Sequence, residues 1–168
     1  MSYDRLETWG LQWPCPDKNH QGSVYLHKDK FSKGKGTFYP CPHIEPAERV
    51  DEAYPFTLST GRMYWHFHTG TMTRRTSTLD REVPGPFAEI HPEDAKSLGI
   101  RDGDMIKVTS RRGSVQIKAK ITDKVKQKSI FITFHFKEAP ANLLTIDAVD
   151  PIAKIPEYKV CAVKIEKI

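Results

Sequence analysis

Residues 105–121 alternate between apolar and polar side chains on either side of a short turn, and this pattern constrains the fold more than any other. Ile106 and Val108 share one face of the first run, which leads to a turn at Arg111-Arg112-Gly113. In the second run the apolar positions are Val115, Ile117, Ala119 and Ile121. A period of two is typical of a β-strand with one buried face. The pattern therefore predicts two strands joined by a hairpin turn.

The rest of the chain after residue 54 adds further short strands and one helix. Strands are predicted at residues 56–58, 88–90, 129–136 and 159–168. A compact helix is predicted at residues 92–99, because Pro92 suits a first turn, two acids follow it, and Gly99 suits a helix end. Short strands, one short helix and abundant turns predict a mainly β fold with short helices. The expected architecture is a small, mainly antiparallel β-barrel.

The chain changes character near residue 50. Residues 1–53 hold most of the turn-forming clusters, among them Trp13-Pro14-Cys15-Pro16 and Tyr39-Pro40-Cys41-Pro42, and they nearly lack a periodic apolar pattern. Such a stretch rarely builds a core of its own. We therefore expect an extended inter-domain segment at 1–53, lying across the next domain or another part of a larger protein. Residues 54–168 are expected to form one β-domain.

Length and charge narrow the classes of function. The 168 residues suffice for one domain with a real core and an appendage. A net charge of +5 fits an anionic cofactor, nucleic acid or a membrane surface. Nucleic acid has little further support, because helix–turn–helix, zinc-finger and aromatic RNA-binding patterns are all missing. No apolar run approaches the roughly 20 residues that cross a bilayer, and the first residues lack a secretory pattern, so a cytoplasmic location without membrane insertion is expected.

The three cysteines, Cys15, Cys41 and Cys161, are widely spaced along the chain. They form no CxxC pair, and no histidine lies near them at the spacing of a zinc finger. Cys161 shares a face of its predicted strand with Val163 and Ile165, so we expect a small core residue there. A disulfide framework, a metal site and a protein-ligated iron–sulfur cluster are not expected in this chain.

Residues 60–75 carry the strongest chemical signal, with two glycines, four threonines, two histidines and three arginines in one stretch. Glycines let the backbone approach a ligand with its N–H groups pointing outward. Hydroxyl and imidazole groups add directional hydrogen bonds, and guanidinium groups bind phosphate oxygens in pairs. The stretch suits a surface that wraps a large polyanionic ligand. A solvent-exposed basic loop, rich in aromatic residues, fits the same composition equally well.

Several motifs after residue 54 occur together in a fixed order and spacing. They are Thr60-Gly61-Arg62, His66-Phe67-His68-Thr69-Gly70-Thr71-Met72-Thr73-Arg74, Ile90-His91-Pro92-Glu93-Asp94-Ala95, Leu98-Gly99-Ile100-Arg101-Asp102-Gly103-Asp104, Val108-Thr109-Ser110-Arg111-Arg112-Gly113, Asn142-Leu143-Leu144-Thr145, Asp150-Pro151 and Pro156-Glu157-Tyr158-Lys159-Val160-Cys161-Ala162-Val163. This set resembles the signature of the C-terminal, dinucleotide-binding domain of molybdopterin oxidoreductases, the DMSO reductase family. The resemblance covers most of residues 54–168. It implies a double-psi β-barrel, which agrees with the predicted strands.

The leading segment is similar to the stretch that precedes this domain in formate dehydrogenase alpha subunits. The similarity rests on Tyr3-Asp4-Arg5-Leu6 and Gly10-Leu11-Gln12-Trp13-Pro14-Cys15-Pro16. Formate dehydrogenase alpha subunits are therefore nearest by pattern, followed by assimilatory and periplasmic nitrate reductases. In that family the domain caps a molybdopterin guanine dinucleotide cofactor, which carries molybdenum or tungsten in the full enzyme.

The resemblance also implies roles for particular residues. Ten positions match cofactor contacts of the family, namely Thr60, Gly61, Arg62, His66, His68, Thr69, Gly70, Phe134, Asn142 and Lys159. The first seven follow a strand and would reach pterin and phosphate groups, whereas the last three come from later segments. An Asn amide can meet the mixed donors and acceptors of guanine and pterin rings, and pyrophosphate attracts Arg and Lys. Four other arginines, Arg74, Arg75, Arg111 and Arg112, fit surface exposure or salt bridges as well as ligand contact.

Catalytic subunits of the family are several times longer than this chain. They carry a four-cysteine cluster site, and an active-site cysteine or selenocysteine, in other domains. Nothing in these 168 residues corresponds to either feature, so no residue here is expected to be catalytic. Oxidation of formate needs a metal centre and a route for electrons. The chain is therefore expected to be part of an oxidoreductase that is inactive alone, and any iron–sulfur cluster would lie in the missing domains.

Three accounts of the function remain open. In the first, the chain is the C-terminal part of a formate dehydrogenase alpha subunit, and its partner is the rest of that subunit; residues 1–53 favour this account. In the second, it is a separate cofactor-capping subunit, similar to the barrel subunit of formylmethanofuran dehydrogenase, or a domain of a nitrate reductase. In the third, it is a double-psi barrel without redox chemistry. The third is disfavoured, because the sequence lacks a self-processing serine motif and paired aspartic-protease signatures.

Overall fold

The structure is a computed structural model that describes residues 1–168, with the exception of the side chain of Thr8. The chain divides into two units, Met1–His43 and Ile44–Ile168. Residues 44–53, which the sequence pattern grouped with the leading segment, thus belong to the same unit as the strands. The division into an inter-domain segment at 1–53 and a barrel domain at 54–168 stays a prediction.

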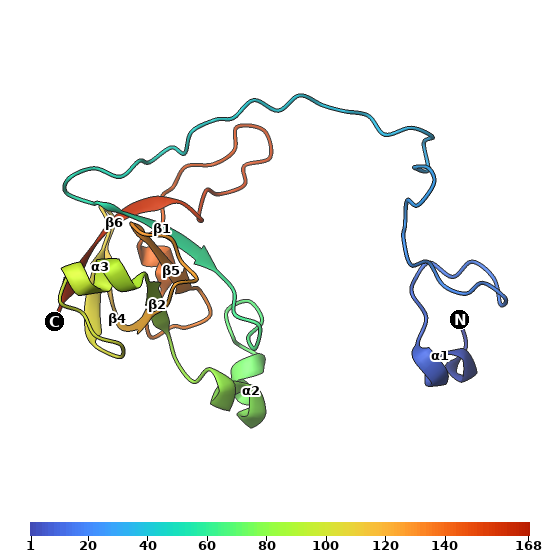
Figure 1. Ribbon diagram of the computed structural model, residues 1–168, viewed down its shortest axis with the longest axis horizontal. Coiled ribbons are helices and arrows are strands. Elements are labelled where there is room, and N and C mark those ends of the chain that lie inside the picture. Colours follow the sequence, from blue (N-terminus) through green and yellow to red (C-terminus); the bar gives the residue numbers. More distant parts are fainter. The chain divides into compact units, whose positions relative to one another are not determined.

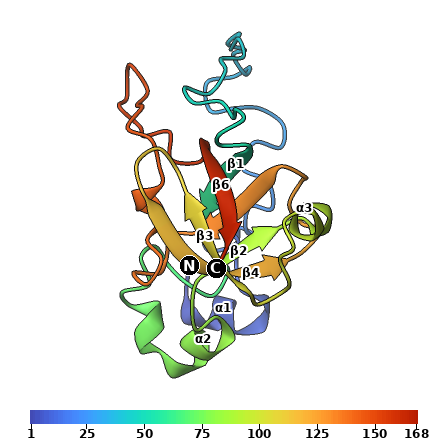
Figure 2. The same cartoon turned by 90° about the vertical axis from the view of Figure 1, so that its left-hand side faces the viewer.

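Six strands of the second unit close into a barrel with the order β1-β5-β2-β4-β3-β6 (Figures 1 and 2). Their bounds are β1 Phe56–Gly61, β2 Phe87–Ile90, β3 Met105–Thr109, β4 Ser114–Ile121, β5 Ser129–Thr133 and β6 Cys161–Lys167. The helices are α1 Tyr3–Trp9, α2 Ser77–Glu82 and α3 Pro92–Ser97, and the 3-10 turns are η1 Thr73–Arg75 and η2 Ala141–Leu143. The predicted mainly β fold with short helices is confirmed.

The pairing of the strands identifies the barrel as a double-psi β-barrel. β1 pairs with β5 in parallel and β2 pairs with β4 in parallel, whereas the other four neighbouring pairs are antiparallel. The expectation of a mainly antiparallel barrel is therefore confirmed. The parallel pairs have a functional consequence, because they bring the carboxyl ends of two strands, and the loops that follow them, to the same edge of the barrel.

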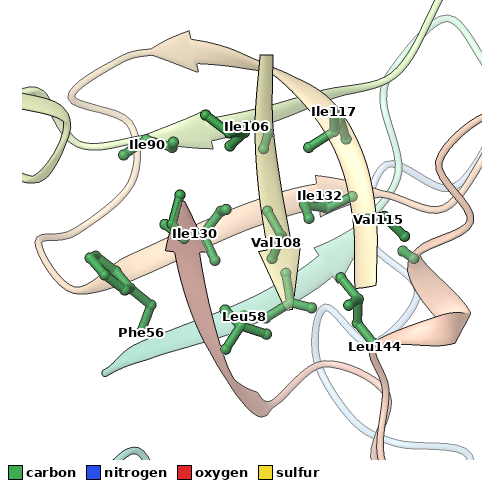
Figure 3. Packing of buried hydrophobic residues seen from close by; sticks show 14 of the residues in the cluster. Phe56, Leu58, Ile90, Ile106, Val108, Val115, Ile117, Ile130, Ile132 and Leu144 are labelled. Atoms are coloured by element: carbon green, nitrogen blue, oxygen red, sulfur yellow. The ribbon is translucent and has the colours of Figure 1, made fainter. Parts of the chain in front are cut away.

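The alternating side chains of the strands fill the interior of the barrel. Figure 3 shows Leu58, Ile106, Val108, Ile130 and Ile132 gathered inside the ring of strands, and all five are fully buried. They come from three strands, β1, β3 and β5, that are far apart in the sequence. Burial of such side chains is the main favourable term in folding, at about 1.5–3 kcal/mol each. The period of two seen in the sequence is therefore the pattern that closes the core.

The helix α3 begins and ends as the sequence indicates. The ring of His91 accepts a hydrogen bond from the backbone N–H of Glu93 at 3.2 Å and so caps the helix, and Pro92 occupies its first turn. Gly99 follows the helix with a φ of 65°, a left-handed conformation that glycine adopts without strain. Ala95 packs into the barrel core. The structured helix ends at Ser97, slightly before the predicted end at residue 99.

Several elements differ from the predicted ones. β5 ends at Thr133 instead of residue 136, and β6 begins at Cys161 instead of residue 159. The helices α1 and α2 were not predicted; α2 has no buried residue, so it lacks the periodic apolar face by which helices are recognised. The expectation for Cys161 is confirmed, because its side chain is buried and its thiol is free.

Glu48 fastens residues 44–53 to the barrel. One carboxylate oxygen accepts hydrogen bonds at 2.6 Å from both Arg111 and Arg112. The other accepts from Arg112 at 2.8 Å and from the backbone N–H of Ala162 at 2.9 Å. The side chain of Glu48 is only 12% exposed. The two arginines of the hairpin turn are thus bound within the chain.

The surroundings of Glu48 change its ionisation. Burial alone would raise its pKa, but hydrogen bonds from Arg112, Ala162 and Arg111 outweigh burial and lower the pKa from 4.5 to about 2. The same arginine cluster binds the segment at a second point, where Arg111 pairs with Asp51 and lies 4.5 Å above the ring of Tyr54. The carboxylate of Glu48 is therefore charged throughout the physiological pH range.

The first unit holds little buried surface of its own. Arg5 donates to the carbonyl oxygens of Asp17 and His20 and contacts the sulfur of Cys15, which together close a small turn-rich structure. Every residue from 24 to 45 is exposed, and Phe38 is 99% exposed. Among the helices of the described chain, none is both long and apolar enough to cross a membrane.

Limited proteolysis is expected to cut the 168-residue chain within residues 24–43 well before it cuts the barrel. The segment offers exposed backbone without a packed core, and such regions are the preferred sites of cleavage. Mass spectrometry of the early fragments is expected to show a resistant product that retains residues 48–168, because Glu48 ties that start to the barrel. Equal rates of cleavage in both units, or a resistant product that begins after Tyr54, would contradict this expectation.

Candidate functional site

One edge of the barrel collects the segments that carry the predicted site residues. β1 is parallel to β5 and antiparallel to β6, so the carboxyl ends of β1 and β5 lie beside the beginning of β6. The β1–β6 register pairs Leu58 with Cys161, and its extension by two residues sets Thr60 opposite Lys159. The hydroxyl of Thr60 donates to the carbonyl of Tyr158 at 2.7 Å, which agrees with this extension.

The end of β1 places Thr60 and Gly61 beneath the site and leaves them little freedom. Thr60 is 2% exposed, and its hydroxyl already has a partner within the chain. A Cβ atom at Gly61 would lie 2.6 Å from the ring of Phe131, so the backbone reaches this position only with glycine. The carbonyl of Gly61 accepts a hydrogen bond from the N–H of Phe134 at 3.2 Å. These two predicted residues therefore shape the backbone at the edge.

Residues 62–72, here called the β1 loop, carry the exposed donors of the site. Arg62, His68 and Thr69 are all exposed. Arg62 lies 3.4 Å from the Nδ1 atom of His68, and its guanidinium stands 5.9 Å from the centre of the ring of Phe134. The hydroxyl of Thr69 lies 3.0 Å from that of Thr71. The loop thus brings a guanidinium, an imidazole and two hydroxyls together on one exposed surface.

His66 lies under the β1 loop instead of on its surface. It is 4% exposed. Its Nε2 atom donates to the carbonyl of Val83 at 2.8 Å, and its Nδ1 atom lies 3.1 Å from the hydroxyl of Thr73. Both ring nitrogens therefore have partners within the chain. The geometry gives His66 a supporting role, so its predicted ligand contact would have to come from the backbone.

Gly70 lies near the end of the β1 loop in a conformation that favours glycine. Its φ is 73°, in the left-handed region. A Cβ atom there would lie 2.9 Å from the side chain of Arg74 and 3.1 Å from the carbonyl oxygen of His135. The loop therefore packs closely on the segment that follows β5.

His135 was not among the predicted residues, yet it links the two segments at the edge. It is 1% exposed. Its Nε2 atom accepts a hydrogen bond from the N–H of Met63 at 2.7 Å, and its Nδ1 atom donates to the carbonyl of His68. This pattern corresponds to the neutral imidazole with its proton on Nδ1. Burial lowers its pKa below 6.5, and the charges of His66 and Arg62 act in the same direction.

Asn142 and Lys159 reach the same edge from later in the chain. Both are exposed. Asn142 lies on the turn η2, and this turn packs closely on the hairpin of β3 and β4, because a Cβ atom at Gly113 would lie 2.9 Å from the carbonyl oxygen of Leu143. The ammonium of Lys159 lies 5.9 Å from the centre of the ring of Tyr158. The turn η2 and the start of β6 thus add an amide and a second cation.

Other arginines near the edge are engaged in ion pairs. Arg74 pairs with Asp80 at 3.3 Å and with Glu138 at 2.8 Å, and its guanidinium lies 5.0 Å from the centre of the ring of Phe136. Arg112 is bound by Glu48. For these arginines the structure favours the salt-bridge interpretation over ligand contact.

The charge and hydrogen-bonding capacity of the edge determine what it can bind. Its exposed groups include two cations, Arg62 and Lys159, and also an imidazole, hydroxyls and an amide. The hydroxyl of Thr133, opposite Gly61, is buried and has no hydrogen-bond partner. No acidic residue belongs to the predicted set, so the edge suits an anion with many acceptors. Across the described residues, no group of three or more His, Cys, Asp or Glu side chains is placed to hold a metal ion.

A cavity of about 850 Å³ adjoins the edge but is distinct from the predicted set. It lies between the β1 loop, the segment before β2, and strands β3 and β4, with Met63, Trp65 and Phe87 in its lining. None of the ten predicted residues lines it. The chemistry of the exposed donors, and not this largely apolar hollow, therefore defines the candidate site.

Comparison with known proteins finds relatives that match along the entire chain. The chain is 53% identical over 170 residues to the F420-dependent formate dehydrogenase subunit alpha of Methanocaldococcus jannaschii, a match that covers 100% of this chain and 25% of that protein. It is 44% identical to the nitrate reductase of Symbiobacterium thermophilum over 94% of this chain and 24% of that protein. The chain thus spans about a quarter of the length of the curated relatives it matches.

A solved structure shows the same fold. The acetylene hydratase of Pelobacter acetylenicus matches with a TM-score of 0.60 and 22% identity, over 68% of this chain and 18% of that protein. The family model described as "Molydopterin dinucleotide binding domain" matches residues 56–162, which include all ten predicted positions. Its bounds begin with β1 and end within β6. This chain therefore belongs to the family of molybdopterin dinucleotide-binding domains.

Proposed function

We propose that the chain is the cofactor-binding part of a formate dehydrogenase catalytic subunit, and that the barrel edge described above binds molybdopterin guanine dinucleotide. The observation that carries this proposal is the β1–β6 register, whose extension sets Thr60, two residues before Arg62, opposite Lys159. The turn η2, which carries Asn142, packs on the β3–β4 hairpin beside the start of β6. The similarity to formate dehydrogenase alpha subunits along the entire chain supports the choice of enzyme.

The residues of the edge fit the chemistry of this cofactor. A dinucleotide carries a pyrophosphate, which calls for cations and N–H donors, and ring edges that mix donors and acceptors. The exposed groups of Arg62 and Lys159 meet the first requirement, and the amide of Asn142 meets the second. Gly61 and Gly70 bring backbone close to the site where side chains would collide with Phe131 and Arg74.

The proposal divides the work between the chain and the cofactor. When bound, the cofactor supplies a molybdenum or tungsten centre for two-electron oxidation of formate. Arg62 and Lys159 bind the pyrophosphate, Asn142 and Thr69 orient the rings, and Phe134 lines the adjoining surface. The buried side chain of His135 contacts the β1 loop, which carries Arg62 and Thr69, and the buried side chain of His66 joins that loop to the segment that follows it. The catalytic groups lie elsewhere in the larger subunit, which is the expected partner.

Formate is favoured over nitrate by the pattern of similarity. Three formate dehydrogenase alpha subunits match at 46–53% identity over 100% of this chain, against 44% over 94% for the nitrate reductase. The assay that separates the two uses the complete catalytic subunit that carries this chain, with formate and a dye acceptor in one arm, and nitrate and a reduced dye in the other. Turnover of nitrate alone would replace formate by nitrate in the proposal.

The 168-residue chain alone is expected to bind guanosine diphosphate saturably and to show no formate:dye oxidoreductase activity. Guanosine diphosphate carries the guanine and the pyrophosphate that the edge is proposed to recognise. Isothermal titration calorimetry measures this binding, and inorganic pyrophosphate serves as the control for phosphate recognition alone. Failure to bind either compound would contradict the assigned site, and formate oxidation by the chain alone would contradict the division of work.

A further inference from the structure

We propose that His135 is a positioning residue, whose neutral imidazole holds the β1 loop in the shape that presents Arg62, His68 and Thr69 to the cofactor. The inference rests on the proposed function for its consequence in binding. Its structural part, that His135 fixes the β1 loop, stands on the contacts of the described chain alone. His135 lies outside the ten positions that match family contacts, and its ring is too deeply buried to touch a ligand itself.

His135 contacts the β1 loop near its start, in its middle and near its end. The N–H of Met63 donates to Nε2 at 2.7 Å, and Nδ1 donates to the carbonyl of His68. The carbonyl oxygen of His135 lies beneath Gly70, where it would stand 3.1 Å from an added Cβ atom. A single buried residue thus contacts the backbone directly after Arg62 and directly before Thr69, and lies close to the backbone of Gly70.

The contact with His68 has a direct effect on the exposed surface. His68 has a φ of 48°, a conformation that non-glycine residues adopt only where their surroundings hold them. The hydrogen bond from His135 to its carbonyl supplies such a restraint. Because the ring of His68 lies 3.4 Å from the guanidinium of Arg62, the backbone conformation of His68 also places Arg62.

Both hydrogen bonds of the His135 ring can form only while the imidazole is neutral. Protonation would place a hydrogen on Nε2, facing the N–H of Met63, and the hydrogen bond would become a repulsion between two donors. The titratable and charged groups that face the ring are His66 and His68 from the β1 loop and Arg62 at its start, and none of them is an acid. The aromatic neighbours Phe134 and Phe136 add no charge.

The pH dependence follows from the direction of the pKa shift. Burial is the largest cause that lowers the pKa of His135, and the hydrogen bond to His68 opposes it only in part. A base with a lowered pKa in the folded state stabilises that state fully above its unfolded pKa, near 6.5. The contribution is lost as the pH falls from about 6.5 through the lower folded value. The β1 loop is therefore expected to loosen on mild acidification.

Two variants of His135 and one control test the proposal in the 168-residue chain. His135→Phe keeps a ring of similar size and removes both hydrogen bonds, whereas His135→Gln retains one acceptor and one donor. The control is His91→Asn, which keeps a capping acceptor on α3, on another element and outside the site. Amide hydrogen exchange of Met63, measured by NMR without ligand, reports the loop directly. Titration with guanosine diphosphate reports its consequence for binding.

We expect His135→Phe to speed exchange at Met63 and to weaken guanosine diphosphate binding, each by about tenfold, as for one lost hydrogen bond of a buried group. His135→Gln is expected to recover part of both, and His91→Asn to change neither. In the unmodified chain, the nitrogen shifts of His135 are expected to show the Nδ1-protonated neutral ring at pH 7.5. The protection factor of the Met63 amide, its intrinsic exchange rate at each pH divided by the observed rate, is expected to fall as that ring protonates below pH 6.5.

The outcomes separate the inference from the proposed function. Unchanged exchange at Met63 in His135→Phe would overturn the inference, whatever the nucleotide does. Faster exchange with no binding of guanosine diphosphate by any variant would support the role of His135 in the loop and contradict the proposed site. If His135→Phe fails to fold, the pH series on the unmodified chain tests the inference instead. A protection factor at Met63 that stays constant while His135 protonates would overturn it.

Discussion

Replacing Glu48 by glutamine is expected to lower the free energy of unfolding of the barrel by about 2 kcal/mol at pH 7. The shift of its pKa from 4.5 to about 2 corresponds to about 3 kcal/mol, at about 1.4 kcal/mol per unit. Partial exposure of Arg111 and Arg112 reduces this to about 2 kcal/mol. The variant leaves two guanidinium groups without their shared carboxylate, and an unpaired charge beside the core is costly.

The stabilisation by Glu48 is expected to depend on pH, in a direction that follows from its lowered pKa. A carboxylate with a lowered pKa stabilises the folded state above its unfolded pKa of 4.5, and this contribution disappears as the pH falls toward about 2. The difference in unfolding free energy between the natural chain and Glu48→Gln is therefore expected to be constant above pH 6. It is expected to shrink steadily on acidification below pH 4.5.

Urea denaturation followed by circular dichroism measures both effects on the 168-residue chain. Glu52→Gln is the matched control, because Glu52 is an exposed acid in the same segment, and it is expected to change stability by less than about 0.5 kcal/mol. Equal stability of Glu48→Gln and Glu52→Gln at pH 7 would show that the segment adds nothing to the barrel. A difference that persists at low pH would assign the loss to packing instead of charge.

The barrel was predictable because the alternation of apolar and polar residues within a strand indicates which of its faces is buried. The alternation at Val115, Ile117 and Ala119 is reproduced in the burial of β4, whose neighbouring positions point outward. The ends of strands were less predictable, since Phe134 continues the apolar pattern of β5 after the backbone has left the sheet. There the backbone turns toward the β1 loop, and that long-range contact leaves no period in the sequence.

The hydrogen-bond donors of the candidate site were predictable from the sequence, but the buried residues that hold the site in shape were not. Motif similarity located Arg62 and Lys159, and the strand register places the segments that carry them at the same edge of the barrel. Motif similarity could not distinguish Arg74 from an arginine that is exposed. Arg74 is neutralised by Asp80 and Glu138, which lie 6 and 64 positions away in the sequence. His66 and His135 are buried supports. His135 occupies the polar position of the alternating run Phe134-His135-Phe136, so the local pattern did not show that it would be buried.

Residues that contact the cofactor differ from residues that support the loop, and this difference leads to the second prediction with a large effect. In the complete catalytic subunit that carries this chain, Arg62→Ala is expected to lower cofactor occupancy by about tenfold or more. A bidentate bond from a guanidinium to phosphate contributes about 1.5–3 kcal/mol, which corresponds to roughly 10- to 100-fold in affinity. The fold has little to lose, because Arg62 is exposed and its polar contact within the chain is a long one, 3.4 Å to His68.

Metal content and released guanine nucleotide, each measured per mole of subunit, report occupancy, and thermal unfolding of the metal-free subunit reports the fold. Arg101→Ala removes an exposed arginine of the turn after α3 and is expected to leave occupancy unchanged. Arg62→Lys keeps the charge without the planar fork, so it is expected to fall between the natural chain and Arg62→Ala. If Arg62→Ala retained full occupancy, the guanidinium would be a surface charge after all. If it lost occupancy and stability in parallel, Arg62 would support the β1 loop as His135 does, and the cation that meets the pyrophosphate would have to be Lys159.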